Sequence, residues 1–76
     1  MKDLLYTIVK NLVTDQEKIK ITEEEDENTI LLKLEVDRED IGKIIGKNGR
    51  VIKSIRTVIK AGGFNTKKRI LVEIVE

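Results

Sequence analysis

The residues of this chain that are best suited to bind a ligand lie around two glycines in its second half. Gly46 and Gly49 enclose Lys47 and Asn48, and Arg50 follows directly. Glycine adopts positive φ without steric cost and asparagine tolerates the left-handed region, so these residues predict a very tight turn. Backbone N–H groups exposed in such a turn attract anions, phosphate above all, and the two cations add full charges.

The distribution of charge also separates this region from the rest of the chain. The net charge is only +1, but residues 1–42 hold 6 basic and 12 acidic side chains, whereas residues 43–76 hold 9 basic and 2 acidic ones. Because the glycine turn lies in the basic half, this split favours a positive surface for a polyanion on a nearly neutral protein. The alternative is an ordinary solvated face that binds nothing.

Two helices are expected to position the turn. Asp37 is a favourable N-cap, and Asp40 three residues later would complete a variant capping box, so a first helix is expected over residues 38–45, with Gly46 as its stop. A second helix is expected over residues 50–61, with an apolar face and a basic face. Its basic residues are Arg50 and Lys53, near enough to the turn to meet phosphate, and Arg56 and Lys60, expected to be ordinary solvated charges.

The remaining sequence predicts one more helix and three strands. Apolar residues at three- and four-residue offsets indicate a helix over residues 2–13, and Phe64 is expected to cap the end of the later helix pair. The acidic run at residues 23–28 is expected to form a solvated hairpin connection rather than a metal site, because it lacks the spacing of a calcium loop. Alternating apolar residues predict strands over residues 18–22, 29–36 and 69–75.

Composition restricts the class of function. The chain has no cysteine and no histidine, and its only serine, Ser54, lies in a predicted helix. It therefore offers no nucleophile–base pair and no zinc ligand set, so we expect neither an enzyme nor a metal or cofactor. The length predicts a single domain over residues 1–76, and no apolar run approaches the roughly 20 residues of a membrane span. The absence of cysteine fits the cytoplasm.

The segment Ile45-Gly46-Lys47-Asn48-Gly49-Arg50-Val51-Ile52-Lys53-Ser54-Ile55 resembles the Ile-Gly-x-x-Gly-x-x-Ile-x-x-Ile signature of KH domains. The expected order of elements is similar to that of type II KH domains, which are typical of bacteria. Their α+β fold, α-β-β-α-α-β, has a three-stranded sheet with the helices packed on one face. Over its whole length the chain looks like the small stand-alone bacterial KH proteins of the KhpA type.

The resemblance implies binding of single-stranded RNA, with about four nucleotides clamped by the Gly-x-x-Gly loop. It also implies a post-transcriptional regulator or RNA chaperone that forms a homodimer or pairs with a larger KH-domain protein. Two alternatives stay open, namely a KH-fold dimerisation module, favoured by apolar Leu31, Leu71 and Val75 on the outer face of the sheet, and a binder of single-stranded DNA. The candidate RNA-binding residues are Lys43, Ile45, Gly46, Lys47, Asn48, Gly49, Arg50, Ile52 and Lys53.

Overall fold

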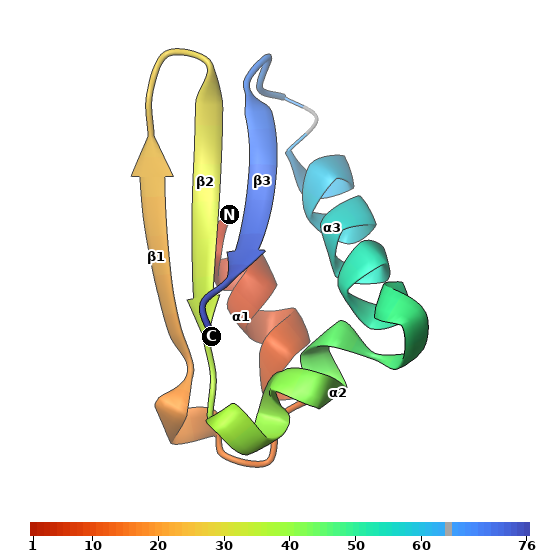
Figure 1. Ribbon diagram of the computed structural model, residues 1–76. Coiled ribbons are helices and arrows are strands. Elements are labelled where there is room, and N and C mark those ends of the chain that lie inside the picture. The colour runs from red at the N-terminus through yellow and green to blue at the C-terminus, as the bar shows by residue number, and fades with distance from the viewer. Residues whose placement is uncertain (64) are drawn as a thin grey trace.

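The computed structural model describes residues 1–63 and 65–76, and its elements follow the predicted order α-β-β-α-α-β (Figure 1). The helices are α1 (Lys2–Lys10), α2 (Ile41–Ile45) and α3 (Arg50–Gly62). The strands are β1 (Lys20–Glu25), β2 (Thr29–Glu35) and β3 (Arg69–Ile74). Single turns of 3₁₀ helix precede β1, α2 and α3 at Gln16–Lys18, Arg38–Asp40 and Lys47–Gly49.

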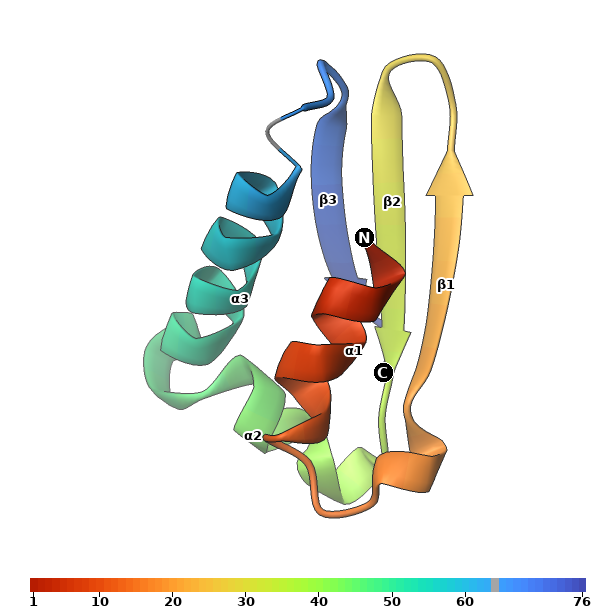
Figure 2. The ribbon, with the colours of Figure 1, turned by 180° about the vertical axis from the view of Figure 1, so that it is seen from behind.

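The three strands form one mixed sheet with β2 in the centre. β1 pairs with β2 in antiparallel register through a hairpin, and β3 pairs with β2 in parallel register. A parallel neighbour requires a long crossover, and the segment that contains α2 and α3 provides it. Seen from behind, α1 lies in front of the sheet while α3 runs beside β3, so the helices cover one face as predicted (Figure 2).

An aliphatic core fills the space between the sheet and the helices. On β2, the buried residues Ile30, Leu32 and Leu34 alternate with partly exposed ones, as expected for a strand with one covered face. Burial of these apolar side chains is the main source of stability for a chain without disulfides. The other buried apolar residues are Leu5, Val9, Val13, Ile44, Ile52, Ile55, Ile59, Ile70 and Val72.

Helix α1 is shorter than the sequence predicted, because it ends at Lys10 rather than at residue 13. Asn11 closes it by donating its side-chain N–H to the Thr7 carbonyl at 2.9 Å, and the Leu12 N–H bonds the Val9 carbonyl at 2.9 Å in a tighter turn. The chain must then reverse towards β1, and Val13 still turns into the core. Hydrophobic periodicity therefore identified the buried face correctly but not the last helical residue.

The prediction for the first strand was displaced along the chain. Residues 16–18 form a 3₁₀ turn capped by Asp15, which accepts a hydrogen bond from the Glu17 N–H at 3.1 Å. β1 therefore begins at Lys20 and includes three glutamates that were expected in the connection. An edge strand open to solvent tolerates these charges, and they discourage pairing with other chains. The hairpin turn itself is held by Asp26, which accepts from the Asn28 and Thr29 N–H groups.

Smaller differences concern the helix pair. The expected helix over residues 38–45 divides into a 3₁₀ turn and α2, with the Asp37 carboxylate accepting from the Glu39 N–H at 2.9 Å as an N-cap should. α3 runs to Gly62, one residue further than predicted. Phe64 lies outside the described residues. Within the described ranges, no helix has the length and apolar character that crossing a membrane requires, and no cluster of acidic side chains could hold a metal ion.

We expect Leu32→Ala to reduce the free energy of unfolding by about 2–5 kcal/mol, because it removes buried side-chain atoms of the central strand and leaves a cavity in the core. Leu71→Ala removes the same atoms from a residue that is 41% exposed, whereas Leu32 is 0% exposed, so its effect should stay within about 0.5 kcal/mol. Urea unfolding followed by circular dichroism measures both. Equal losses in the two variants would contradict the assignment of the covered face.

Candidate nucleic-acid interface

The glycine loop, residues 46–49, is a tight turn between α2 and α3, as predicted. Three of its four residues have positive φ, namely Gly46 at 74°, Asn48 at 56° and Gly49 at 72°. Gly46 has a second reason to lack a side chain, because a Cβ there would overlap the side chain of Val51. Both the sharp reversal and the close packing of α2 on α3 therefore depend on this glycine.

The turn supplies no internal acceptor for two of its backbone donors. The Gly46 N–H bonds the Gly42 carbonyl at 2.9 Å, the Gly49 N–H bonds the Gly46 carbonyl at 3.1 Å, and the Arg50 N–H bonds the Lys47 carbonyl. Lys47 and Asn48 are the first two residues of this 3₁₀ turn, so the turn offers no internal acceptor to their N–H groups. Two adjacent free amides at an exposed tip are suited to an anion, because each can donate to an oxygen atom.

The structure gathers most of the predicted site residues around this tip. Lys47 and Asn48 are exposed on the loop, while Arg50 and Lys53 are exposed on the first turns of α3. None of these three cations has an ion-pair partner in the described parts of the chain. The two glycines of the loop are partly buried, as is Ile45 just before it, and Ile52 on α3 is buried.

Lys43 differs from the other predicted cations, because its ammonium group already has partners within the protein. It lies 3.3 Å from the Asp40 carboxylate and also donates a hydrogen bond to the Thr14 hydroxyl. Half of its side chain remains exposed, at 52%. Its charge is therefore already partly balanced, and it contributes less to an anion site than a free cation would.

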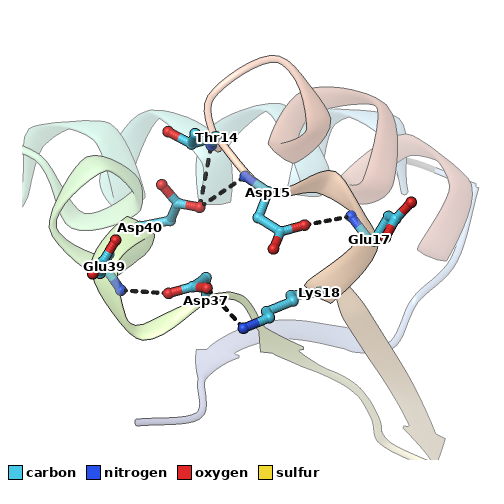
Figure 3. Close-up of polar contacts among 7 residues, drawn as sticks. All are labelled: Thr14, Asp15, Glu17, Lys18, Asp37, Glu39 and Asp40. Atoms are coloured by element: carbon cyan, nitrogen blue, oxygen red, sulfur yellow. Dashed lines mark hydrogen bonds and ion pairs between the residues drawn. The ribbon is translucent and has the colours of Figure 1, made fainter.

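Asp40 has a structural role that differs from the one predicted from the sequence. It does not complete a capping box; its buried carboxylate accepts hydrogen bonds from the N–H groups of Thr14 at 3.1 Å and Asp15 at 3.2 Å (Figure 3). The bonds join the segment after α1 to the base of α2, which carries the glycine loop. No local signal could reveal them, because the partners are 25 and 26 residues away in sequence.

Opposing effects determine the pKa of Asp40. Burial by itself would raise the pKa, but the Thr14 and Asp15 amides and the Lys43 ammonium together outweigh it and hold the pKa below its ordinary value. Nearby, the Glu39 amide and the Lys18 ammonium at 3.1 Å lower the pKa of Asp37. Both carboxylates therefore stay ionised at neutral pH, where they hold the beginning of α2 in place.

A groove of about 520 Å³ adjoins the glycine loop; we call it the α3–β3 groove. Ile45 and Ile52, which stand on either side of the loop, form part of its helical wall together with Arg56. Its strand wall comes from β3, the residue Leu31 on β2 and the chain after β3. The groove is largely aliphatic. The residues of the strand wall are Leu31, Leu71, Val72, Glu73, Ile74 and Glu76.

Arg56 was expected to be an ordinary solvated charge, and this was wrong. Its Nε and Nη2 atoms donate hydrogen bonds to the Val72 carbonyl at 3.3 and 3.1 Å, which ties α3 to the outer edge of β3. The residue follows Ile52 by one helical turn, so it continues the same side of α3. The helical spacing alone gives the side of α3 on which Arg56 lies. The contact that Arg56 makes depends on the position of β3, which lies far away in sequence.

A larger hollow of about 1,200 Å³ lies elsewhere, near the first 3₁₀ turn and the beginning of α2. Its lining residues include neither Ile45 nor Ile52, the two groove residues that flank the glycine loop. Charges of both signs line it, and two of them, Lys18 and Asp37, neutralise each other in an ion pair of 3.1 Å. The smaller α3–β3 groove is therefore the better candidate for binding a polyanion, since Ile45 and Ile52 in its lining flank the loop and its cations.

A glycine turn between two helices, beside an aliphatic groove in an α-β-β-α-α-β fold, defines a type II KH domain. The family model described as the KH domain of KhpA/KhpB matches residues 2–74, and the chain belongs to this family. The family is not enzymatic, in agreement with the sequence analysis.

Several curated relatives span the chain from end to end. The RNA-binding protein KhpA of Clostridium acetobutylicum is 49% identical over 99% of this chain and 100% of its own length. Proteins of the same name from Listeria monocytogenes and Aquifex aeolicus are 45% and 40% identical over 100% of this chain, covering 100% and 96% of their own lengths. No solved structure gave a significant match.

We expect Asp40→Asn to destabilise the protein at pH 7 and to lose this effect in acid. Because the folded pKa of Asp40 lies below its ordinary value of about 3.9, its stabilising effect is complete above that value and disappears as the pH falls through the folded pKa. The urea midpoints of the wild type and the variant should therefore converge below about pH 4.

Glu39→Gln is the control for this experiment, since Glu39 is exposed and its carboxylate has no hydrogen bond or ion pair in the described chain. It should leave the midpoint unchanged at each pH. A difference between the wild type and Asp40→Asn that stays constant from pH 7 to pH 3 would show that the Asp40 charge does not stabilise the fold.

Proposed function

We propose that this protein binds single-stranded RNA, with about four unpaired nucleotides in the α3–β3 groove and their phosphates at the glycine loop. The observation that carries the proposal is the pair of N–H groups at Lys47 and Asn48, which have no acceptor within the turn. They belong to exposed residues between Ile45 and Ile52, and those two isoleucines line this groove. The names of the relatives, which are RNA-binding proteins, support the choice of ligand.

The loop can bind a phosphodiester through both geometry and charge. The two amides supply fixed donors, while Lys47 and Arg50 supply cations on either side of them. Lys53 lies one turn further along α3, at a distance that suits the next phosphate of an extended strand. Lys43, partly balanced by Asp40, would have a secondary role in this site.

The groove suits the bases of such a strand. Its volume of about 520 Å³ falls within the range of small-molecule sites, and Ile45 and Ile52 provide apolar surface for the faces of the bases. None of its lining residues is aromatic. Stacking on aromatic rings, worth about 1–3 kcal/mol per base elsewhere, is therefore not available here, and we expect modest affinity for a single site.

Modest affinity at one site favours assembly. We propose that the single domain, residues 1–76, acts in the cytoplasm as a homodimer or with a larger KH-domain partner, because two linked sites raise avidity without new contacts. The exposed apolar residues Val58 and Leu71, at 46% and 41%, offer surface for such contacts. A role in post-transcriptional regulation or as an RNA chaperone would follow from weak binding to many RNAs.

Replacing Lys47 and Asn48 with aspartates should weaken RNA binding by about tenfold or more, because two negative charges would then face the phosphates. The fold should remain intact, since both side chains are exposed and take part in no hydrogen bond or ion pair. Fluorescence anisotropy with a labelled single-stranded RNA measures the affinity, and circular dichroism checks the fold.

The matched control is the double change Asn65→Asp with Lys67→Asp, which alters the same residue types at exposed positions beyond the other end of α3. It should reduce affinity much less. Equal reductions in the two double variants would mean that net charge, and not the loop, determines binding. Tighter binding of single-stranded DNA than of RNA with the same sequence would favour the DNA alternative, and dimerisation without binding either would favour the interaction module.

The dependence of affinity on salt should reveal how many cations meet phosphate. Neutralisation of about three phosphates by Lys47, Arg50 and Lys53 predicts a slope near −2 for the logarithm of the association constant against that of salt concentration. Lys53→Gln should make the slope shallower by about 0.7. Lys60→Gln, further along the same helix, should leave the slope unchanged. A change in slope of similar size in Lys60→Gln would contradict the proposed placement of the RNA strand.

A further inference from the structure

The α3–β3 groove has two walls of opposite charge. In residues 43–76 the only acidic residues are Glu73 and Glu76, and both line this groove. Both belong to the strand wall of the groove. Arg56 lies on the helical wall, and the cations of the glycine loop are next to that wall. Both acidic side chains of a half of the chain with 9 basic residues therefore line the site that we propose for RNA, and Glu76 lines the larger hollow as well.

These carboxylates are not neutralised within the protein. Neither has an ion pair or hydrogen bond in the described residues. Lys33 is the register partner of Glu73 on β2, but its ammonium group pairs with Glu24 at 3.3 Å instead. Arg56, the cation that shares the groove, donates to the Val72 carbonyl. Glu73 and Glu76 therefore keep their full capacity to accept hydrogen bonds from a ligand.

Two uncompensated negative charges exclude phosphate from the strand wall. A strand in the groove would thus hold its backbone against the loop and turn the edges of its bases towards Glu73 and Glu76. An ionised carboxylate only accepts hydrogen bonds. It matches the amino groups of cytosine and adenine, and the N1–H and amino group of guanine, which are all donors. Uracil presents a single N–H between two carbonyl oxygens, and these oxygens would face the carboxylate unfavourably.

We propose that Glu73 and Glu76 are specificity-determining residues that select bases carrying an amino group over uracil. This inference rests on the proposed function, since it assumes that RNA occupies the groove. It assigns base discrimination to the strand wall and affinity to the loop, so the two can be separated by mutation. Because the groove has no aromatic platform, such polar contacts are its main means of telling bases apart.

The test is fluorescence anisotropy with three labelled eight-nucleotide RNAs that contain only cytosine, only adenine or only uracil. The wild type should bind the cytosine and adenine strands at least about fivefold more tightly than the uracil strand. In Glu73→Gln with Glu76→Gln, binding of uracil should tighten most, because glutamine can also donate and two repulsive charges are lost. The ratio of affinities should therefore fall towards one, and Glu73→Gln alone should give a partial change.

The charge-matched control is Glu23→Gln with Glu27→Gln, two exposed acids outside the groove. It should strengthen binding of all three RNAs by one common factor and leave the ratios unchanged. Equal binding of the three RNAs by the wild type, or a common factor in the groove variant too, would overturn this inference but not the proposed function. Failure of the wild type to bind any of the three would contradict both.

Discussion

Three positive φ angles within four residues are the constraint on which the rest of this structure depends. At Gly46, Asn48 and Gly49 the backbone reverses so sharply that α2 and α3 meet almost without a connecting segment. The same geometry bonds the Gly46 and Gly49 amides within the protein and provides no acceptor inside the turn for those of Lys47 and Asn48. The turn that shapes the helix pair thus also creates the donors, and neither property can change without the other.

The position of this turn is fixed from both sides. Buried Asp40 holds the base of α2 to the segment after α1, and Ile44 anchors α2 in the core. On the other side, Ile52 and Ile55 pack α3 down, while Arg56 joins it to the edge of β3. A phosphate at the loop and a base in the groove would therefore meet a frame that is already organised, which limits the entropy lost on binding.

The sequence was sufficient to predict the glycine loop and the order of elements, because each depends on local φ preference or on hydrophobic periodicity. It was not sufficient where the partner is distant in sequence. The carboxylate of Asp40 and the guanidinium of Arg56 have local patterns that suggested a capping box and a solvated charge, and only the folded chain brings their true partners within reach. The same holds for Glu73, which reaches the groove through the parallel pairing of β3.

The predicted boundaries of β1 were wrong for another reason, since an edge strand accepts polar residues without periodicity.

The most direct test of this account is a titration of the ¹⁵N-labelled protein with an eight-nucleotide single-stranded RNA, followed by two-dimensional NMR. The amide resonances of Lys47 and Asn48 should shift most, together with those of Ile45 and Ile52 in the groove. Resonances around the larger hollow, such as those of Lys18 and Val36, should not move. Shifts concentrated in that hollow, with the two loop amides unaffected, would contradict the claim that this turn binds the phosphodiester chain.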